Sequence, residues 1–176
     1  PEWRSFTVCE GGVAVPEATP APSPAMEADE YAAKLGTEVA EVSIARIENV
    51  LEGDGRPHGS SEFIAVTQLE DVQFQIHREP ADAPWAQIET RIAVPGEGHT
   101  EVSLQEKANQ WNNAHLQPTV FPIEDGDGWA LMAASRFFVG EGLSDRQIHA
   151  MLRRGLIIGL SAAQEVPALF GEGAEE

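Results

Sequence analysis

The chain has 176 residues, of which 42% are hydrophobic, and its formal net charge is −18. This size and composition suit one globular domain with flexible ends. The acidic surface argues against nucleic acids and anionic membranes as partners, because both are bound mainly through Lys and Arg. A protein partner is compatible with such a surface. The chain shows no secretory signal and no apolar run long enough to span a bilayer, so we expect a cytoplasmic protein.

Residues 1–37 are predicted to be a flexible, acidic, Pro-rich segment. A short β-like patch at Trp3–Val8 is followed by four prolines in nine residues, at positions 16–24. Closely spaced prolines favour extended, solvated backbone. A short helix is expected over Glu27–Leu35, closed by Gly36.

The predicted domain covers residues 38–166. Thr37 is a candidate N-cap for a first helix, since hydrophobic residues recur at helical spacing as far as Gly53. Alternating hydrophobic and polar residues then predict three strands. They are Phe63–Gln68, Val72–His77 and Trp85–Val94.

The second half of the domain continues with a helix over Glu101–His115. Two strands follow, Thr119–Ile123 and Gly128–Val139, joined by the acidic turn 124–127. The last helix takes Ser144 as its N-cap, with Gln147 as the capping-box partner. Residues 167–176 are predicted to be a disordered acidic tail.

The expected fold is therefore α+β, with an antiparallel five-stranded sheet and helices packed on one face. The order of elements is α-β-β-β-α-β-β-α. Short connections between the strands favour the antiparallel arrangement.

Four parts of this pattern resemble the YbjN family, which is also labelled bacterial sensory transduction regulators. They are the motif Asn109–Asn112 late in the middle helix, the turn region Asp125–Trp129, the helix start Gly142–Ser144 and the apolar helix Ile148–Ala163. The resemblance covers roughly residues 38–166. It implies a fold similar to type III secretion chaperones, which commonly act as dimers, and no established enzymatic activity. Pro122 departs from the family pattern and is tolerable at a sheet edge.

The motif Asn109–Asn112 has two interpretations. As a binding surface, Asn109, Trp111 and Asn112, together with Trp129, would supply contact area and directional hydrogen bonds. As a structural element, Trp111 would pack under the sheet while an asparagine closes the helix and bonds the next strand. We favour the structural interpretation.

Gly155 and Gly159 form a small-x-x-x-small pair in the last helix. Glycine costs about 1 kcal/mol of helix stability at each such position, so a close contact is expected there. The contact is either intradomain packing, which we favour, or the seam of a homodimer.

No catalytic or metal-binding constellation is recognisable. The five histidines form no ligand pair, and the single cysteine, Cys9, can form neither an intrachain disulfide nor a cysteine zinc site. No G-x-S-x-G motif is present. We therefore expect no cofactor, no metal and no enzymatic activity.

Two functions from different classes remain. The first is a protein-interaction or chaperone-like module that binds partners through an exposed sheet face or edge. The second is a small-molecule-binding protein or enzyme with a pocket between the sheet and the last helix. Its candidate lining residues are Trp85, Trp129, Phe137 and Phe138.

Overall fold

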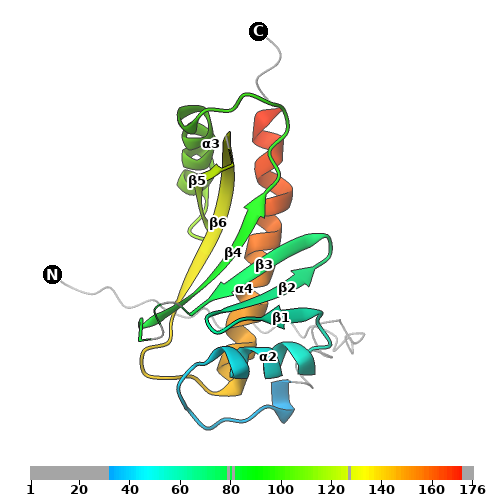
Figure 1. Ribbon diagram of the computed structural model, residues 1–176, viewed down its shortest axis with the longest axis vertical. Helices are drawn as coiled ribbons and strands as arrows, with labels where there is room; N and C mark the ends of the chain where they lie inside the picture. Colours follow the sequence, from blue (N-terminus) through cyan, green and yellow to red (C-terminus); the bar gives the residue numbers. More distant parts are fainter. Residues whose placement is uncertain (1–31, 79, 81, 127, 172–176) are drawn as a thin grey trace, which may run out of the picture.

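A computed structural model describes residues 32–78, 80, 82–126 and 128–171. Within this range the chain forms helices and strands in the order α-β-β-β-β-α-β-β-α-η. Figure 1 shows their arrangement. The helices are α2 (Ile44–Gly53), α3 (Glu101–Ala114), α4 (Asp145–Glu165) and the 3-10 helix η1 (Val166–Phe170). The strands are β1 (His58–Ser60), β2 (Ile64–Leu69), β3 (Val72–His77), β4 (Trp85–Ile92), β5 (Thr119–Asp125) and β6 (Gly128–Phe138).

The six strands form one antiparallel sheet in the order β1-β2-β3-β4-β6-β5. Its longest ladder joins β4 to β6 and runs from Trp85 opposite Phe138 to Ile92 opposite Leu131. The expected α+β class, antiparallel sheet and order of the main elements are confirmed.

All the helices cover the same face of the sheet (Figure 1). Along β4, Ala86, Ile88 and Ile92 are buried on this face, whereas Trp85 and the polar residues that alternate with them point to the other side. Among the described residues, no helix lies on the opposite face. This asymmetry positions the site described below.

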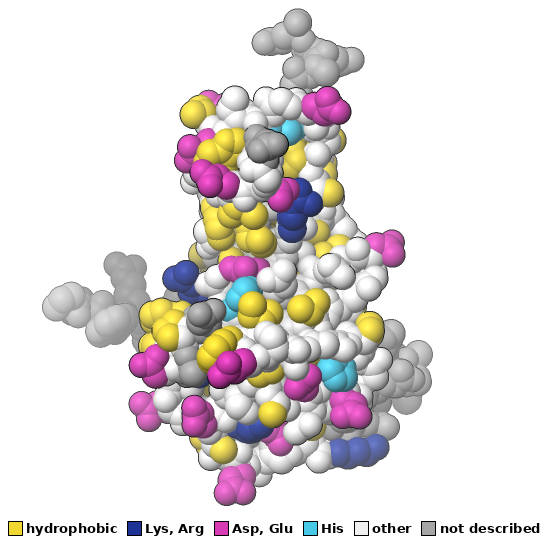
Figure 2. Space-filling model, in the orientation of Figure 1, with side chains coloured by type: hydrophobic (Ala, Val, Ile, Leu, Met, Phe, Trp, Pro, Cys, Tyr) yellow, Lys and Arg dark blue, Asp and Glu magenta, His cyan; other side chains and the backbone are white. Residues whose placement is uncertain are grey.

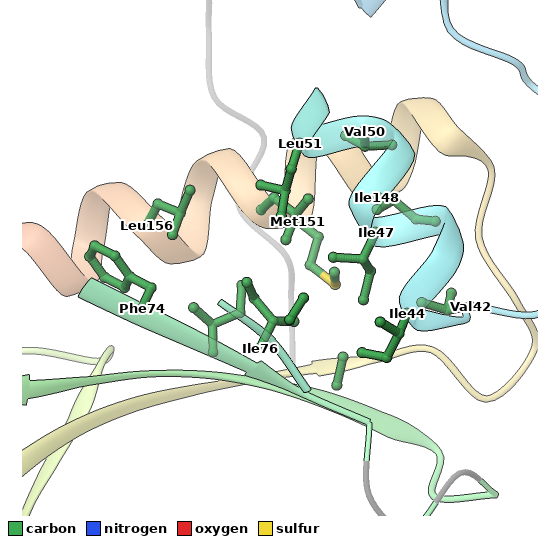
Figure 3. Close-up of a cluster of buried hydrophobic side chains, with 14 of the residues drawn as sticks. Val42, Ile44, Ile47, Val50, Leu51, Phe74, Ile76, Ile148, Met151 and Leu156 are labelled. Carbon is green, nitrogen blue, oxygen red and sulfur yellow. The ribbon is translucent and has the colours of Figure 1, made fainter. Parts of the chain in front are cut away.

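Two hydrophobic cores lie between the helices and the sheet. The first joins α2 and the N-terminal half of α4 to β2, β3 and β4, and it includes Ile47, Phe74, Ile76 and Leu156 (Figure 3). The second joins α3, η1 and the end of α4 to β5 and β6, around Leu104 and Trp111. Strand β4, through Ile88 and Ile92, and helix α4 contribute residues to both cores and so connect them.

The two longer helices begin where their caps dictate. The Ser144 hydroxyl accepts a hydrogen bond from Gln147 N–H while the Gln147 side chain accepts one from Ser144 N–H, so the predicted capping box is present. Thr100 and Ser103 form the same reciprocal pair at α3.

The first helix begins at Ile44, and the prediction that it begins after Thr37 is wrong. The actual N-cap is Ser43, whose side chain accepts a hydrogen bond from Arg46 N–H. The preceding residues are held in an extended conformation because Ala40 and Leu143 exchange two backbone hydrogen bonds, of 3.2 and 2.9 Å.

The sheet has six strands and not five, because β1 was missed. His58, Gly59 and Ser60 are all exposed and show no hydrophobic alternation. Their strand conformation comes from backbone pairing with β2 alone, which leaves no trace in a hydrophobicity pattern.

Two smaller differences concern the ends of elements. Strand β5 extends to Asp125, two residues past its predicted end at Ile123, and the positive φ of the hairpin falls on Gly126 (61°). Beyond the predicted end of the domain at residue 166, the 3-10 helix η1 continues to Phe170, and Leu169 and Phe170 pack against the second core. The remaining tail, 172–176, and the Pro-rich segment 1–31 lie outside the described residues.

Candidate functional site

The helix-free side of the sheet is the candidate site, and we call it the open face. Its hydrophobic side chains come from β2, β4, β5 and β6 and are Ile64, Val66, Trp85, Phe121, Ile123, Met132 and Phe138. Trp85 and Phe138 are paired across the β4–β6 ladder and are 43% and 67% exposed. Figure 2 shows hydrophobic side chains gathered along this face, interrupted by charged and histidine side chains.

A polar network divides the hydrophobic part of the open face. His77 Nε2 lies 3.1 Å from Glu89 Oε2, and the Gln87 side chain donates to the other carboxylate oxygen of Glu89. Arg136 Nε donates to the side-chain oxygen Oε1 of Gln87, and its guanidinium lies 5.9 Å from the centroid of the Trp85 ring. A cation at this distance from an indole ring is attracted by the ring electrons. The network therefore fixes the orientation of Trp85.

Glu89 is held in its ionised form. The hydrogen bond from His77 is the main reason that the pKa of Glu89 lies below the ordinary value of 4.5, with smaller contributions from Gln87 and Arg136, while burial opposes the change. Hydrogen bonds to a carboxylate favour its charged form. The open face thus carries a fixed negative charge at its centre beside the cation of Arg136.

The β5 edge of the sheet is protected against pairing. Asn112 Nδ2 donates to Val120 O at 2.7 Å and Val120 N–H donates to Asn112 Oδ1 at 2.8 Å, so the outward backbone groups of Val120 are satisfied. By strand alternation the next outward residues are Pro122, which has no N–H, and the charged Glu124. Proline and charge on an edge strand both discourage addition of another strand.

The β6 edge is open where it extends past β5. Strand β5 begins at Thr119, opposite Ala134, so within the described part of the chain Arg136 and Phe138 have no strand neighbour on that side. Val139 N–H donates to Pro84 O towards β4, which places the backbone groups of Phe138 on the opposite side of the strand. A pocket of about 470 Å³ lies beside this edge, between the exposed Leu116 and the side of Arg136.

The four residues predicted for binding are not brought together. Trp111 is 4% exposed and donates from Nε1 to Pro118 O at 3.1 Å, while Asn112 bonds β5 as described above. Asn109 is exposed, and its Oδ1 accepts from Gln105 on the same helix. Trp129 is half-buried beside the second core. Trp111 and Asn112 thus have structural contacts, and a binding role for any of the four stays a prediction.

Gly155 and Gly159 lie where α4 approaches the sheet. A Cβ on Gly155 would lie 2.4 Å from Ile88 Cδ1, and a Cβ on Gly159 would lie 2.7 Å from Phe74 Cε1. Both glycines are buried. Their contact is therefore with strands of the same chain.

The pocket expected between the sheet and the last helix does not gather its four aromatic residues. Phe137 faces Gly155 of α4, whereas Trp85 and Phe138 lie on the open face. Trp129 lies at the other end of β6. The close approach of α4 at the two glycines fills the space that such a pocket would need.

The described residues contain no group of three or more His, Cys, Asp or Glu side chains arranged to hold a metal ion. Within the same residues, no helix combines the length and the apolar character needed to cross a membrane. His115 is exposed and stacks on Trp111 with 3.6 Å between ring centroids.

Sequence reasoning named Trp85 and Phe138 but placed them on the wrong side of the sheet. The alternation within β4 separates Trp85 from Ile88, yet it does not say which set faces the helices. Glu89 and Arg136 share the strand alternation of Trp85 and Phe138. These charged residues could have shown that this set faces away from the helices.

Three comparisons with known proteins bear on identity. A family model described as "YbjN: Putative bacterial sensory transduction regulator" matches residues 43–166. No curated protein matches. Among solved structures, the chain is similar to the crystal structure of YbjN from E. coli, whose title describes a "putative transcription regulator".

The similarity to that structure has a TM-score of 0.57 and 13% sequence identity, and it covers 72% of this chain and 96% of the other. At this identity it establishes the shared fold alone. The family match spans the whole of the two-core domain from the N-cap of α2 to the start of η1. The chain is therefore a member of the YbjN family.

Proposed function

We propose that this protein is a non-enzymatic interaction module that binds protein partners through the open face, with a regulatory role in keeping with its family's description. The single observation that carries the proposal is the pair Trp85–Phe138, exposed on a sheet whose other face is sealed by helices. Large exposed apolar groups that cluster on one surface mark interaction sites.

The composition of the open face suits a protein partner. Tryptophan and arginine are over-represented among the residues that dominate binding energy, and here Arg136 lies against Trp85. Glu89 adds a charged group, and His77 beside it adds a polar one, and both can fix the register of a partner. A flat surface of this kind offers a small ligand little enclosure.

Binding at the sheet edge is supported only at β6. The β5 edge is blocked by Asn112, Pro122 and Glu124, whereas the backbone of Arg136 and Phe138 is available to an extended segment. A partner strand placed there would continue the line of β5 and lie beside Phe138 and Leu116. A second copy of the chain is the alternative occupant of this surface and would make a homodimer.

The test is capture of partners from the native lysate by the full chain and by two variants. Trp85→Ser/Phe138→Ser removes the exposed aromatic pair, and Val102→Ser removes an equally exposed side chain on α3 as a matched control. We expect partners to be lost in the first variant and retained in the second. Retention of the same partners by both variants would contradict the proposal.

Size-exclusion chromatography of the same variants separates the two occupants. A dimer that Trp85→Ser/Phe138→Ser converts to monomer would identify a second copy as the occupant. A monomeric wild-type chain that still loses its captured partners in this variant would identify a different protein.

A further inference from the structure

The outer side of α4, away from the sheet, forms a groove of about 430 Å³ that we call the basic groove. It is lined by Arg146, Arg153 and Arg154 together with Ile157 and Ile158, and Ala32 closes one side. Positions 146, 153, 154 and 157 fall on one side of a helix, because residues separated by three, four or seven positions are neighbours.

The basic groove is opposite in charge to the rest of the molecule. Three of the eleven Lys and Arg residues line it in a chain with a net charge of −18. Among the described residues, no carboxylate lies within ion-pair distance of these three arginines; Asp145, the nearest acid in sequence, pairs with Arg46. Ile157 is 52% exposed beside them. Such a combination fits an occupant that is both acidic and partly apolar.

The chain itself enters this groove. Ala32 lines it, residues 32–34 are helical, and Gly36 O accepts a hydrogen bond from Arg146 N–H at 3.2 Å. The residues immediately before Ala32 are Met26-Glu27-Ala28-Asp29-Glu30-Tyr31. They combine three carboxylates with two large hydrophobic side chains and contain no Lys or Arg.

The reach of the six residues before Ala32 also matches the length of the basic groove. From Arg146 to Ile158 the helix rises by roughly 18 Å, at 1.5 Å per residue. Six residues cover between about 9 Å as a helix and about 20 Å when extended. A segment that starts at Ala32 can therefore reach along the whole groove.

We propose that the segment Met26–Tyr31 of the same chain occupies the basic groove, with its carboxylates paired to the three arginines and its hydrophobic side chains over Ile157 and Ile158. Each exposed ion pair is weak and screened by salt. The short connection nevertheless supplies an effective concentration in the millimolar range, which is enough for weak contacts to persist. An acidic partner must displace this segment before it can bind α4.

The test places a nitroxide on the segment in the full chain, as Met26→Cys in a Cys9→Ser background. Paramagnetic broadening of backbone amides is then measured by NMR along α4. We expect strong broadening from Arg153 to Ile158. It should fall several-fold in Arg153→Glu/Arg154→Glu and return when Asp29→Arg/Glu30→Arg is added to that variant.

The controls separate docking from simple proximity to the attachment point. Arg91→Glu reverses an exposed charge on the open face and should leave the broadening of α4 unchanged. If the glutamate variant loses its native amide spectrum, the broadening is measured in Arg153→Ala/Arg154→Ala instead. Equal broadening in wild type and in both arginine variants, or broadening centred on the open face, would overturn the proposal.

One further measurement identifies the occupant. Nitroxide-labelled chains are mixed with isotope-labelled chains that carry no nitroxide. Absence of broadening in this mixture supports an intramolecular segment, whereas broadening of α4 would assign the groove to a second copy and refute the intramolecular assignment.

Discussion

The side chain of Asn112, on α3, hydrogen bonds to both backbone groups of Val120, on β5, as a neighbouring strand would. Because the carboxamide has one donor and one acceptor in suitable positions, it completes the ladder for a single residue of the edge strand. The arrangement ties the end of α3 to the sheet and blocks the edge at the same time.

Asn112→Ala should therefore destabilise the fold by about 2 kcal/mol, since two backbone groups lose their partner near the second core. Urea denaturation measures the change. Asn109→Ala is the matched control, because the exposed Asn109 amide accepts a hydrogen bond from Gln105 on the same helix, and a change within about 0.5 kcal/mol is expected. Equal losses in the two variants would show that the bonds to Val120 contribute little.

Gly159→Ala should destabilise the protein although alanine is the better helix former. The added methyl meets the fully buried ring of Phe74, and overpacking costs about 1–3 kcal/mol against a helix gain of about 1 kcal/mol. Gly155→Ala should cost less, because its nearest contact is the end of the Ile88 side chain.

Thermal denaturation of the two glycine variants, with the exposed Gln164→Ala on the same helix as control, gives the comparison. A rise in melting temperature for Gly159→Ala would mean that α4 can move away from β3 at little cost.

Arg46→Lys should be as disruptive as removal of the side chain. Arg46 donates to the Asp145 carboxylate from Nε and Nη2, at 3.0 and 2.6 Å, and to three backbone carbonyl groups. The carbonyls belong to Ala40, Glu41 and Leu143, and lysine cannot reproduce the planar fork.

We expect a loss of about 2 kcal/mol for Arg46→Lys and a similar loss for Arg46→Met, measured by urea denaturation. Arg91→Lys is the control, because the ion pair of Arg91 with Asp125 is largely exposed. Near-native stability of Arg46→Lys alone would show that charge, and not shape, is what the site requires.

The contribution of Glu89 should depend on pH in a defined direction. Its pKa is lowered in the folded state, mainly by the hydrogen bond from His77, so the folded protein holds that proton less tightly than the unfolded chain. The stabilisation is complete above the ordinary pKa of 4.5 and is lost as the pH falls through the lower, folded value.

Glu89→Gln should consequently be less stable than wild type by about 1 kcal/mol at neutral pH, and the gap should narrow below about pH 4. Denaturation curves from pH 7 to 3 test this. A gap that stays constant over the range would mean that the charge of Glu89 is not what stabilises the network.

Sequence patterns predicted the elements whose cause is local. The alternation of Val72, Phe74 and Ile76 marked β3, and Ser144 with Gln147 marked the start of α4, because each pattern reflects contacts made within a few residues.

The remaining features depend on contacts between distant parts of the chain. Ser43 replaces Thr37 as the helix cap because Ala40 is paired to Leu143, about a hundred residues away. The candidate site also depends on distant contacts, because only the pairing of β4 with β6 places Trp85 beside Phe138 and Arg136.

The division into two cores has a spectroscopic consequence. The buried residues of the first core include no tryptophan, whereas Trp111 and Trp129 both belong to the second. Indole emission from the interior therefore reports on α3 and η1, and a phenylalanine-lined region around Phe74 can loosen without changing that signal. Trp85, held under the Arg136 guanidinium on the open face, is an optical probe that responds to whatever covers the sheet.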